Sequence, residues 1–407
     1  MWKCAIVSLL VVGALVGCAA GAQAQTSDQG YGTTRRVSAG GEIAGVIGPR
    51  DDIAFFNYTD YNTNALRVGR LRLFGEWRAV MDRLSVIAEL RSENLSDVDA
   101  HALYLRWRPL AAHNLFVQAG RVPPVMGAFP RRAYGRDNAV IGLPLGYQYL
   151  TSLRPDALPA THDDLLRMRG RGWQSSFPVG STSLEPGISL LAVSRWDTGV
   201  EASWSGGRGE IAAAVTQGSP AVPVVKDRNG GLMISSRAAA YLPAGITVGV
   251  SAGRGRWIDD AVLTLASHDS PASSSQTVIG TDFEWGLGRW LVRSEWLRSS
   301  FELPIVNDPR PETVLTAWTG FVEARYQLLP RWQLGARVER LGFSTLTGTV
   351  SGGVPTPWDA PVDRLEATVA FRAARHVDIR AGWQQNRRPA GRVQTRGFPA
   401  LAALCWF

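Results

Sequence analysis

The residues best suited to chemistry with a solute lie between Pro123 and Met168. Guanidinium groups stay charged at all ordinary pH values and bind carboxylate or phosphate through two parallel hydrogen bonds. Arginines on one side of a passage, facing aspartates on the other, would create a transverse field that sorts solutes by charge and dipole. The alternative is that these charges form ion pairs that pin the segment to a wall. The charged residues are Arg131, Arg132, Arg136, Arg154 and Arg167 with Asp137, Asp156, Asp163 and Asp164, a net charge of 5 − 4 = +1.

The histidines do not suggest a catalytic or metal site. None of the five has the spacing of a Ser/His/Asp constellation or of a known set of metal ligands. The run His162-Asp163-Asp164 could hold a divalent ion, but such a run also suits an ordinary solvated turn. We therefore predict no catalytic residues, no metal and no cofactor, and we expect that the protein is not an enzyme. The five are His101, His113, His162, His268 and His376.

Alternating apolar and polar residues predict the elements that position these charges. From Val68 to Trp77, for example, Leu71 and Leu73 share one face with Trp77, whereas Arg70, Arg72 and Glu76 share the other. This period of two is that of β-strands. The predicted inward charges are Arg70, Arg72, Glu76, Glu89, Arg91, Arg106, Arg108, Arg293, Glu295, Arg337 and Glu339. The predicted outward apolar residues are Leu71, Leu73, Leu103, Leu105, Trp107, Leu334, Val338, Val369, Phe371 and Ile379.

The lengths of the strands and connections indicate a transmembrane barrel. The strands run to roughly 9–12 residues, whereas soluble strands are most often about 5–6 residues long. Short turns alternate with long connections, as in bacterial outer-membrane barrels. We count 18 strands, including a weak one at Gly170–Phe177 and another at Ile188–Trp196, with 16 as the alternative. A large soluble sheet with one wet face is the other interpretation of such alternation.

The N-terminus predicts export. Lys3 precedes an apolar run from Ala5 to Val16, and Ala22-Gln23-Ala24 fits a signal-peptidase site. We predict a signal peptide over residues 1–24, a short periplasmic segment over 25–36 and a barrel over 37–407. The run Leu15 to Cys18 also fits a lipobox, which would make Cys18 a lipidation site.

The last strand and the long connection carry a family resemblance. The chain ends "LAALCWF", with apolar residues at every second position before Phe407, and "FVQAGRVPPVMGAFPRRAYGRDN" leads from a strand into the long connection. The ending resembles that of bacterial outer-membrane β-barrel proteins, and the passage into the long connection resembles that of porins, both general and phosphate- or sugar-selective. The resemblance implies that Phe407 is a signal read by the barrel-assembly machinery. It also implies that loop 123–168 folds inward as the pore constriction, and that the barrel is a homotrimer in lipid and lipopolysaccharide.

Charge and aromatic content suggest which solutes would pass. Of 43 Lys and Arg residues only Lys3 and Lys226 are lysine, which leaves 43 − 2 = 41 arginines, and the formal charge of +8 becomes +7 without Lys3. Export argues against a nucleic-acid partner. We predict an outer-membrane porin that passes small hydrophilic solutes with a modest preference for anions. A sugar-selective porin and a non-conducting structural or adhesive barrel are the alternatives. The aromatic residues that could form a sugar track are Phe55, Phe56, Tyr58, Tyr61, Tyr134, Tyr147 and Tyr149.

Overall fold

The structure is a computed structural model of the chain. The predicted signal peptide and nearly all of segment 25–36 lie outside the described residues. The structure describes residues 36–51, 56–58, 64–95, 98–133, 135–193, 196–266, 274–307, 313–346, 356–390 and 394–407.

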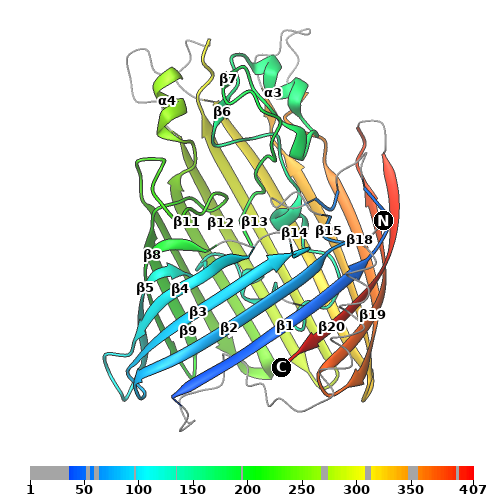
Figure 1. Ribbon diagram of the computed structural model, residues 1–407. Coiled ribbons are helices and arrows are strands. Elements are labelled where there is room, and N and C mark those ends of the chain that lie inside the picture. Colours follow the sequence, from blue (N-terminus) through cyan, green and yellow to red (C-terminus); the bar gives the residue numbers. More distant parts are fainter. Residues whose placement is uncertain are drawn as a thin grey trace.

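The main body of the described residues is a closed barrel of sixteen antiparallel strands. Figure 1 shows the barrel from the side. Each strand pairs with the next along the chain, and β20 pairs with β1. The strands are β1 (Val37–Ile47), β2 (Gly69–Val80), β3 (Leu84–Glu93), β4 (Asp99–Trp107), β5 (Asn114–Val122), β8 (Asp197–Gly206), β9 (Gly209–Thr216), β10 (Met233–Leu242), β11 (Ile246–Arg256), β12 (Ser275–Leu287), β13 (Trp290–Leu303), β14 (Thr313–Leu329), β15 (Trp332–Phe343), β18 (Val362–Ala374), β19 (Val377–Arg387) and β20 (Thr395–Trp406).

The predicted antiparallel barrel is confirmed, and it has 16 strands, the alternative to the count of 18. Gly170–Phe177 and Ile188–Trp196 are not barrel strands but parts of the connection between β5 and β8. The physical reason is visible in Leu190 and Leu191, neighbours that are both buried, whereas a barrel strand would point one of them outward. The inward-folding connection is consequently longer than predicted, because it runs on from Met168 to Trp196.

The predicted alternation of the strands is confirmed. In β15, Trp332, Leu334 and Val338 are exposed on the outer face, whereas Arg337 and Glu339 are buried inside. Leu103, Leu105, Trp107, Val369 and Ile379 are likewise exposed, and Leu71 and Phe371 are half-buried. Aromatic rings pair on neighbouring strands, with 4.5 Å between the ring centroids of Trp290 and Tyr326 and 4.8 Å between those of Trp332 and Phe371.

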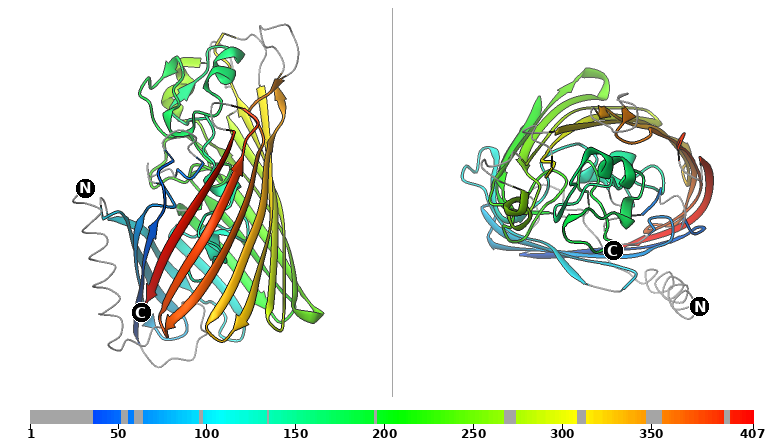
Figure 2. Two further views of the ribbon diagram at one scale, coloured as in Figure 1. Left: turned by 90° about the vertical axis from the view of Figure 1, so that its right-hand side faces the viewer. Right: turned by 90° about the horizontal axis from the view of Figure 1, so that it is seen from above.

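Short elements occupy the connections between the barrel strands. They are η1 (Pro130–Arg132), α2 (Leu145–Gln148), β6 (Ala157–Leu158), α3 (His162–Met168), η2 (Gly172–Gln174), β7 (Val179–Gly180), η3 (Pro243–Gly245), α4 (Asp260–Ala266), β16 (Thr345–Leu346) and β17 (Thr356–Pro357). Seen from above, the connection between β5 and β8 lies inside the ring of strands (Figure 2). No helix among the described residues is long and apolar enough to cross a bilayer.

The two ends of the barrel meet at Gly41 and Phe407. The backbone N–H of each residue donates to the carbonyl oxygen of the other, at 3.0 Å in both directions. A Cβ on Gly41 would lie 2.5 Å from Cζ of Phe407 and 3.0 Å from Cδ2 of the exposed Leu73. The aromatic ring thus covers the outer face of a glycine, at the seam where the sheet closes.

We predict that Phe407→Asp reduces insertion of the barrel into the outer membrane without affecting export. A carboxylate there would replace an apolar ring on the outer face of the closing seam. Heat-modifiable mobility of the membrane fraction measures the folded barrel. Leu184→Asp, a change at an exposed leucine of the connection between β5 and β8, is the control and should insert normally. Normal insertion of Phe407→Asp would contradict the role that we assign to this residue.

Candidate functional site

The connection between β5 and β8 is bound to the barrel wall at several points. Its first attachment is Glu295 of β13, a buried carboxylate that accepts hydrogen bonds from the backbone N–H of Ala128 at 2.8 Å and the Tyr147 hydroxyl at 2.9 Å. Burial, together with the neighbouring Glu295 carboxylate, raises the pKa of Tyr147 well above its ordinary value, so the hydroxyl remains a donor. Gly127 allows this approach, with φ at +72° and a Cβ position only 2.3 Å from the Tyr147 hydroxyl.

Two further wall carboxylates hold the middle of the connection. Oε1 of Glu366 in β18 accepts from the backbone N–H groups of Ile141 and Gly142, at 2.9 and 2.7 Å. Glu339 of β15 accepts from the backbone N–H of Leu145 at 2.5 Å. Carboxylates that accept backbone N–H bonds form charge-assisted hydrogen bonds, which are about twice as strong as neutral ones.

Wall arginines bind the carbonyl groups of the same stretch. Arg337 is fully buried among Glu323, Glu339 and Glu366 and donates to the carbonyl oxygen of Gly142 at 2.8 Å. Arg364 donates to the carbonyl oxygen of Leu143 at 3.0 Å, and Arg380 to that of Asn138 at 2.7 Å. The predicted inward residues Arg337 and Glu339 thus hold the loop. Arg364 and Glu366 of β18 join them, and the alternation that turns Leu365 outward directs both of these side chains inward.

Part of the predicted constriction set is paired with the wall. Arg131 lies 2.9 Å from Glu210 of β9, and Arg132 lies 3.0 Å from Glu284 of β12. Glu284 also binds Arg293, another predicted inward residue, at 2.9 Å. Arg136 and Asp137 are exposed, and the Arg136 guanidinium lies 5.5 Å from the ring centroid of Trp406.

The other five predicted constriction residues lie farther along the connection, and none of the five lines either of the two cavities described below. Arg154 is buried, pairs with Asp156 at 2.6 Å and donates to the carbonyl oxygen of Ser175. Asp164 forms a capping box with Thr161 at the start of α3. Arg167 is 4.0 Å from Asp164 and mostly exposed, and Asp163 lies in the first turn of the same helix.

A hydrophobic core fills the interior of the barrel around residues 145–168 of the connection. Leu145, Leu153 and Leu158 pack there in one cluster with Trp257 and Trp358, all nearly inaccessible to solvent. Phe56, Tyr147 and Tyr149 are buried as well, and the Tyr149 hydroxyl donates to Asp359 at 2.9 Å. Phe56 and Tyr149 therefore pack in the interior instead of forming an open track, whereas Tyr147 also lines the smaller of the two cavities described below. Phe55, Tyr61 and Tyr134 lie outside the described residues.

Two cavities lie between the connection and the barrel wall, and their strand side is formed by β1 to β5, β8 to β10, β19 and β20. The vestibule is an open cavity of about 820 Å³. Its charged lining consists of seven arginines and five carboxylates, a net charge of 7 − 5 = +2. They are Arg72, Arg78, Arg106, Arg108, Arg131, Arg136 and Arg237 with Glu42, Glu76, Asp137, Glu201 and Glu210.

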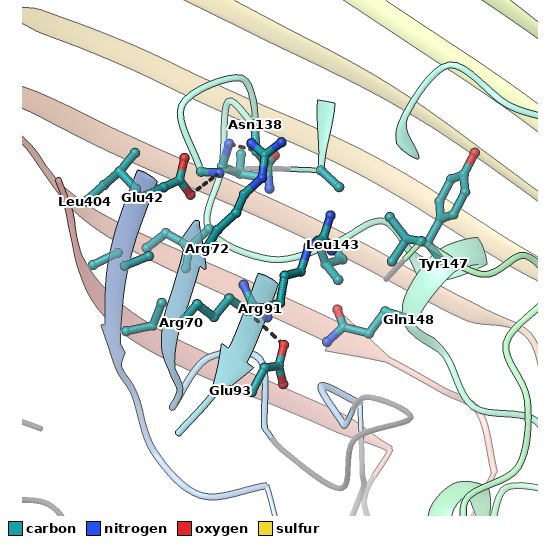
Figure 3. A pocket seen from close by; sticks show the side chains of 18 of the residues that line it. Glu42, Arg70, Arg72, Arg91, Glu93, Asn138, Leu143, Tyr147, Gln148 and Leu404 are labelled. Carbon is teal, nitrogen blue, oxygen red and sulfur yellow. Dashed lines mark hydrogen bonds and ion pairs between the residues drawn. The ribbon is translucent and has the colours of Figure 1, made fainter. Parts of the chain in front are cut away.

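The second cavity, which we call the narrow passage, has a volume of about 120 Å³ and shares Glu42 and Arg72 with the vestibule. Arg70, Arg72 and Arg91 project into it from β2 and β3, and Figure 3 shows Arg72 and Arg91 extending toward Asn138 and Leu143 of the connection. Arg70 pairs with Glu93 at 3.2 Å. The buried Glu89 is shared between Arg72 at 2.9 Å and Arg91 at 2.6 Å, so one carboxylate balances two guanidinium groups.

We predict that Glu366→Ala loosens the connection but leaves the barrel intact. The change leaves the buried N–H groups of Ile141 and Gly142 without an acceptor, at a cost of about 1–3 kcal/mol each. Hydrogen exchange should accelerate in residues 139–145 and remain unchanged in the strands. Glu76→Ala is the matched control, because Glu76 is an inward carboxylate that pairs with Arg78 and not with the connection. Unchanged exchange in Glu366→Ala would show that this carboxylate does not hold the loop.

Comparison with known proteins concerns the fold. No family model and no curated protein matches the chain. Among solved structures, the chain is similar to OmpT, an outer membrane protein of Vibrio cholerae. The match covers 91% of this chain and 97% of the OmpT chain, with 10% sequence identity and a TM-score of 0.53. The outer membrane channel DcaP of Acinetobacter baumannii gives the same coverage, identity and TM-score. The anion-selective porin from Comamonas acidovorans covers 91% of this chain and 99% of its own, with 8% identity and a TM-score of 0.52.

At these identities the likeness establishes the architecture and not the solute. This chain is a closed antiparallel barrel of sixteen strands, and each match extends over nearly the whole length of both chains. The chain therefore has the fold of the outer-membrane porins.

Proposed function

We propose that the protein is an outer-membrane porin through which small hydrophilic solutes diffuse passively, with a modest preference for anions. The outer face of the barrel carries exposed apolar residues along its strands, which suits contact with lipid hydrocarbon. The inner face carries charged groups, which suits contact with water and solutes. Diffusion through such a lumen needs no catalytic group.

The observation that carries the proposal is the arginine cluster of the narrow passage. Arg70, Arg72 and Arg91 come from adjacent strands and line one side of a cavity that adjoins the vestibule. The passage lining holds four arginines, with Arg380 as the fourth, and two glutamates, a net charge of 4 − 2 = +2. A solute that crosses here would meet more positive than negative charge.

Position makes these charges effective. Low-dielectric walls focus the field in a narrow passage, so a fixed charge there acts strongly on a passing ion. On an open surface, salt screens the same charge within about 8–10 Å. The pairing of Arg70 with Glu93 and the sharing of Glu89 reduce the net field, which is why we propose a modest preference.

A non-conducting structural barrel is the second candidate. The observation in its favour is the hydrophobic core around Trp257 and Trp358, which fills part of the interior beside the outer portion of the connection. A bilayer recording distinguishes the two candidates directly, because a structural barrel gives no current.

We also propose the partners that this location implies. They are outer-membrane lipid, lipopolysaccharide and the barrel-assembly machinery that would read Phe407. A homotrimer is the proposed assembly, and one structure of Vibrio cholerae OmpT with the same fold is of a trimer form, at 11% identity and a TM-score of 0.53.

We predict that Arg72→Gln and Arg91→Gln, made separately, each shift the reversal potential toward cations, and more strongly at low salt. A unit charge at about 4 Å in water contributes about 1 kcal/mol. This corresponds to about a fivefold change in permeability for each monovalent ion, in opposite directions for anion and cation, so the anion-to-cation permeability ratio should fall by about fivefold or more. Each single change leaves Glu89 paired with the other arginine.

The matched control is Arg208→Gln, at an exposed arginine in the turn between β8 and β9. It should leave the reversal potential unchanged. Equal shifts in the control and in the two passage variants would contradict the assignment of selectivity to the narrow passage.

A further inference from the structure

The two sides of the narrow passage differ in chemistry. The strand side carries Arg70, Arg72 and Arg91. On the side of the β5–β8 connection, no described residue that lines the passage is charged. Opposite the arginines lie Val140, Ile141 and Leu143 (the apolar wall), so the aspartates expected to face them are absent from this part of the lining.

The apolar wall is held in place by hydrogen bonds between the backbone of the connection and the side chains of β18. Ile141 and Gly142 donate their backbone N–H groups to Glu366, and the Leu143 carbonyl oxygen accepts from Arg364. Because the backbone polar groups are bound to the barrel wall, the side chains of Val140 and Leu143 are left to line the passage. Leu404 of β20 extends the apolar surface from the barrel itself.

The size of the passage forces a solute to meet both sides together. An engineered apolar cavity of about 150 Å³ binds benzene. The narrow passage, at about 120 Å³, suits a small ring or short chain and leaves little room for a full hydration shell. A sugar-like solute would lose hydrogen bonds to water against the apolar wall, and unmatched polar groups are costly to desolvate. A hydrocarbon chain would instead gain from leaving water.

We propose that the passage favours monocarboxylates with a hydrocarbon body over equally charged monocarboxylates with a hydroxylated body. The carboxylate contacts the guanidinium groups of β2 and β3, and the hydrocarbon contacts Val140, Ile141 and Leu143. This inference rests on the proposed function and names the class of solute for the same site.

The vestibule offers a similar pairing of charge and apolar surface. The Arg106 guanidinium lies 5.7 Å from the ring centroid of Tyr104 and 5.9 Å from that of Phe116. Arg136 lies over Trp406 in the same way. Phe116 and Trp406 line the vestibule together with both arginines, so an organic anion would meet a ring and a cation there as well.

Hexanoate and gluconate test the proposal, because both are six-carbon monocarboxylates and differ in their hydroxyl groups. At pH 7.5 both are ionised, since carboxyl pKa values lie near 4. The full-length mature protein is placed in planar bilayers, and the permeability of each anion relative to potassium is obtained from reversal potentials. We expect hexanoate to exceed gluconate by about fourfold or more beyond the ratio of their mobilities in water, the effect of burying about one methylene group.

Two sets of variants separate the apolar wall from the charges. Val140→Thr, which keeps the shape of the side chain, and Leu143→Asn should each lower the ratio toward that of the mobilities. Arg91→Gln should lower the permeability of both anions and leave their ratio unchanged. Heat-modifiable mobility confirms that each variant is folded, and Val140→Thr provides the test if Leu143→Asn does not fold.

The outcomes distinguish this inference from the function on which it rests. Absence of current with every salt would overturn both. Chloride current with a hexanoate-to-gluconate ratio equal to that of the mobilities would overturn the inference and leave the porin intact. An elevated ratio that Val140→Thr and Leu143→Asn leave unchanged would also overturn it, because the preference would then arise elsewhere.

Discussion

The structure depends on one constraint, that a sheet in lipid must leave no backbone edge unpaired. An exposed N–H or C=O group has no water partner in hydrocarbon, so a spanning sheet has to close. Here closure is made by β1 and β20, and the reciprocal hydrogen bonds of Gly41 and Phe407 complete it. Closure in turn gives each strand a lipid side and an inner side, and charges that alternate with outward apolar residues, such as Arg337 and Glu339 in β15, are directed into the lumen.

A closed lumen then has to accommodate the charges that it receives. Isolated buried charges are costly, and pairing alone compensates incompletely. Backbone groups of the β5–β8 connection form additional hydrogen bonds with the charged side chains of the inner wall. Arg337 is surrounded by three carboxylates, and it and two of them also bind backbone groups of the connection. The same contacts fix this stretch of the loop against β15 and β18, and the narrow passage lies between the connection and strands β1 to β3, β19 and β20.

Much of the fold could be predicted from the sequence because alternation is a local property. The outward position of Val338 and the inward position of Arg337 follow from the pleat alone. Gly170–Phe177 and Ile188–Trp196 were misassigned as strands because a short apolar run looks alike in a strand and in a packed loop. Only tertiary contacts, such as the burial of both Leu190 and Leu191, distinguish the two.

The candidate site is less predictable, because the sequence position of a charged residue does not show which side chains it will contact in the folded barrel. Arg131 and Arg132 are in the predicted loop, but carboxylates of β9 and β12 happen to lie within reach. Arg70, Arg72 and Arg91 were predicted to point inward, and the structure brings them together at the narrow passage. The apolar wall had no sequence signal, since Val140 and Leu143 resemble ordinary core residues until the anchors at Glu366 and Arg364 are known.

The central claim is that an open, net positive passage runs between the loop and the first strands. The most direct test is the reversal potential of the wild-type protein in a planar bilayer across a potassium chloride gradient at low salt. The account predicts a measurable conductance with chloride more permeant than potassium. A purified, folded barrel that gives no current, or one that prefers potassium, would contradict it.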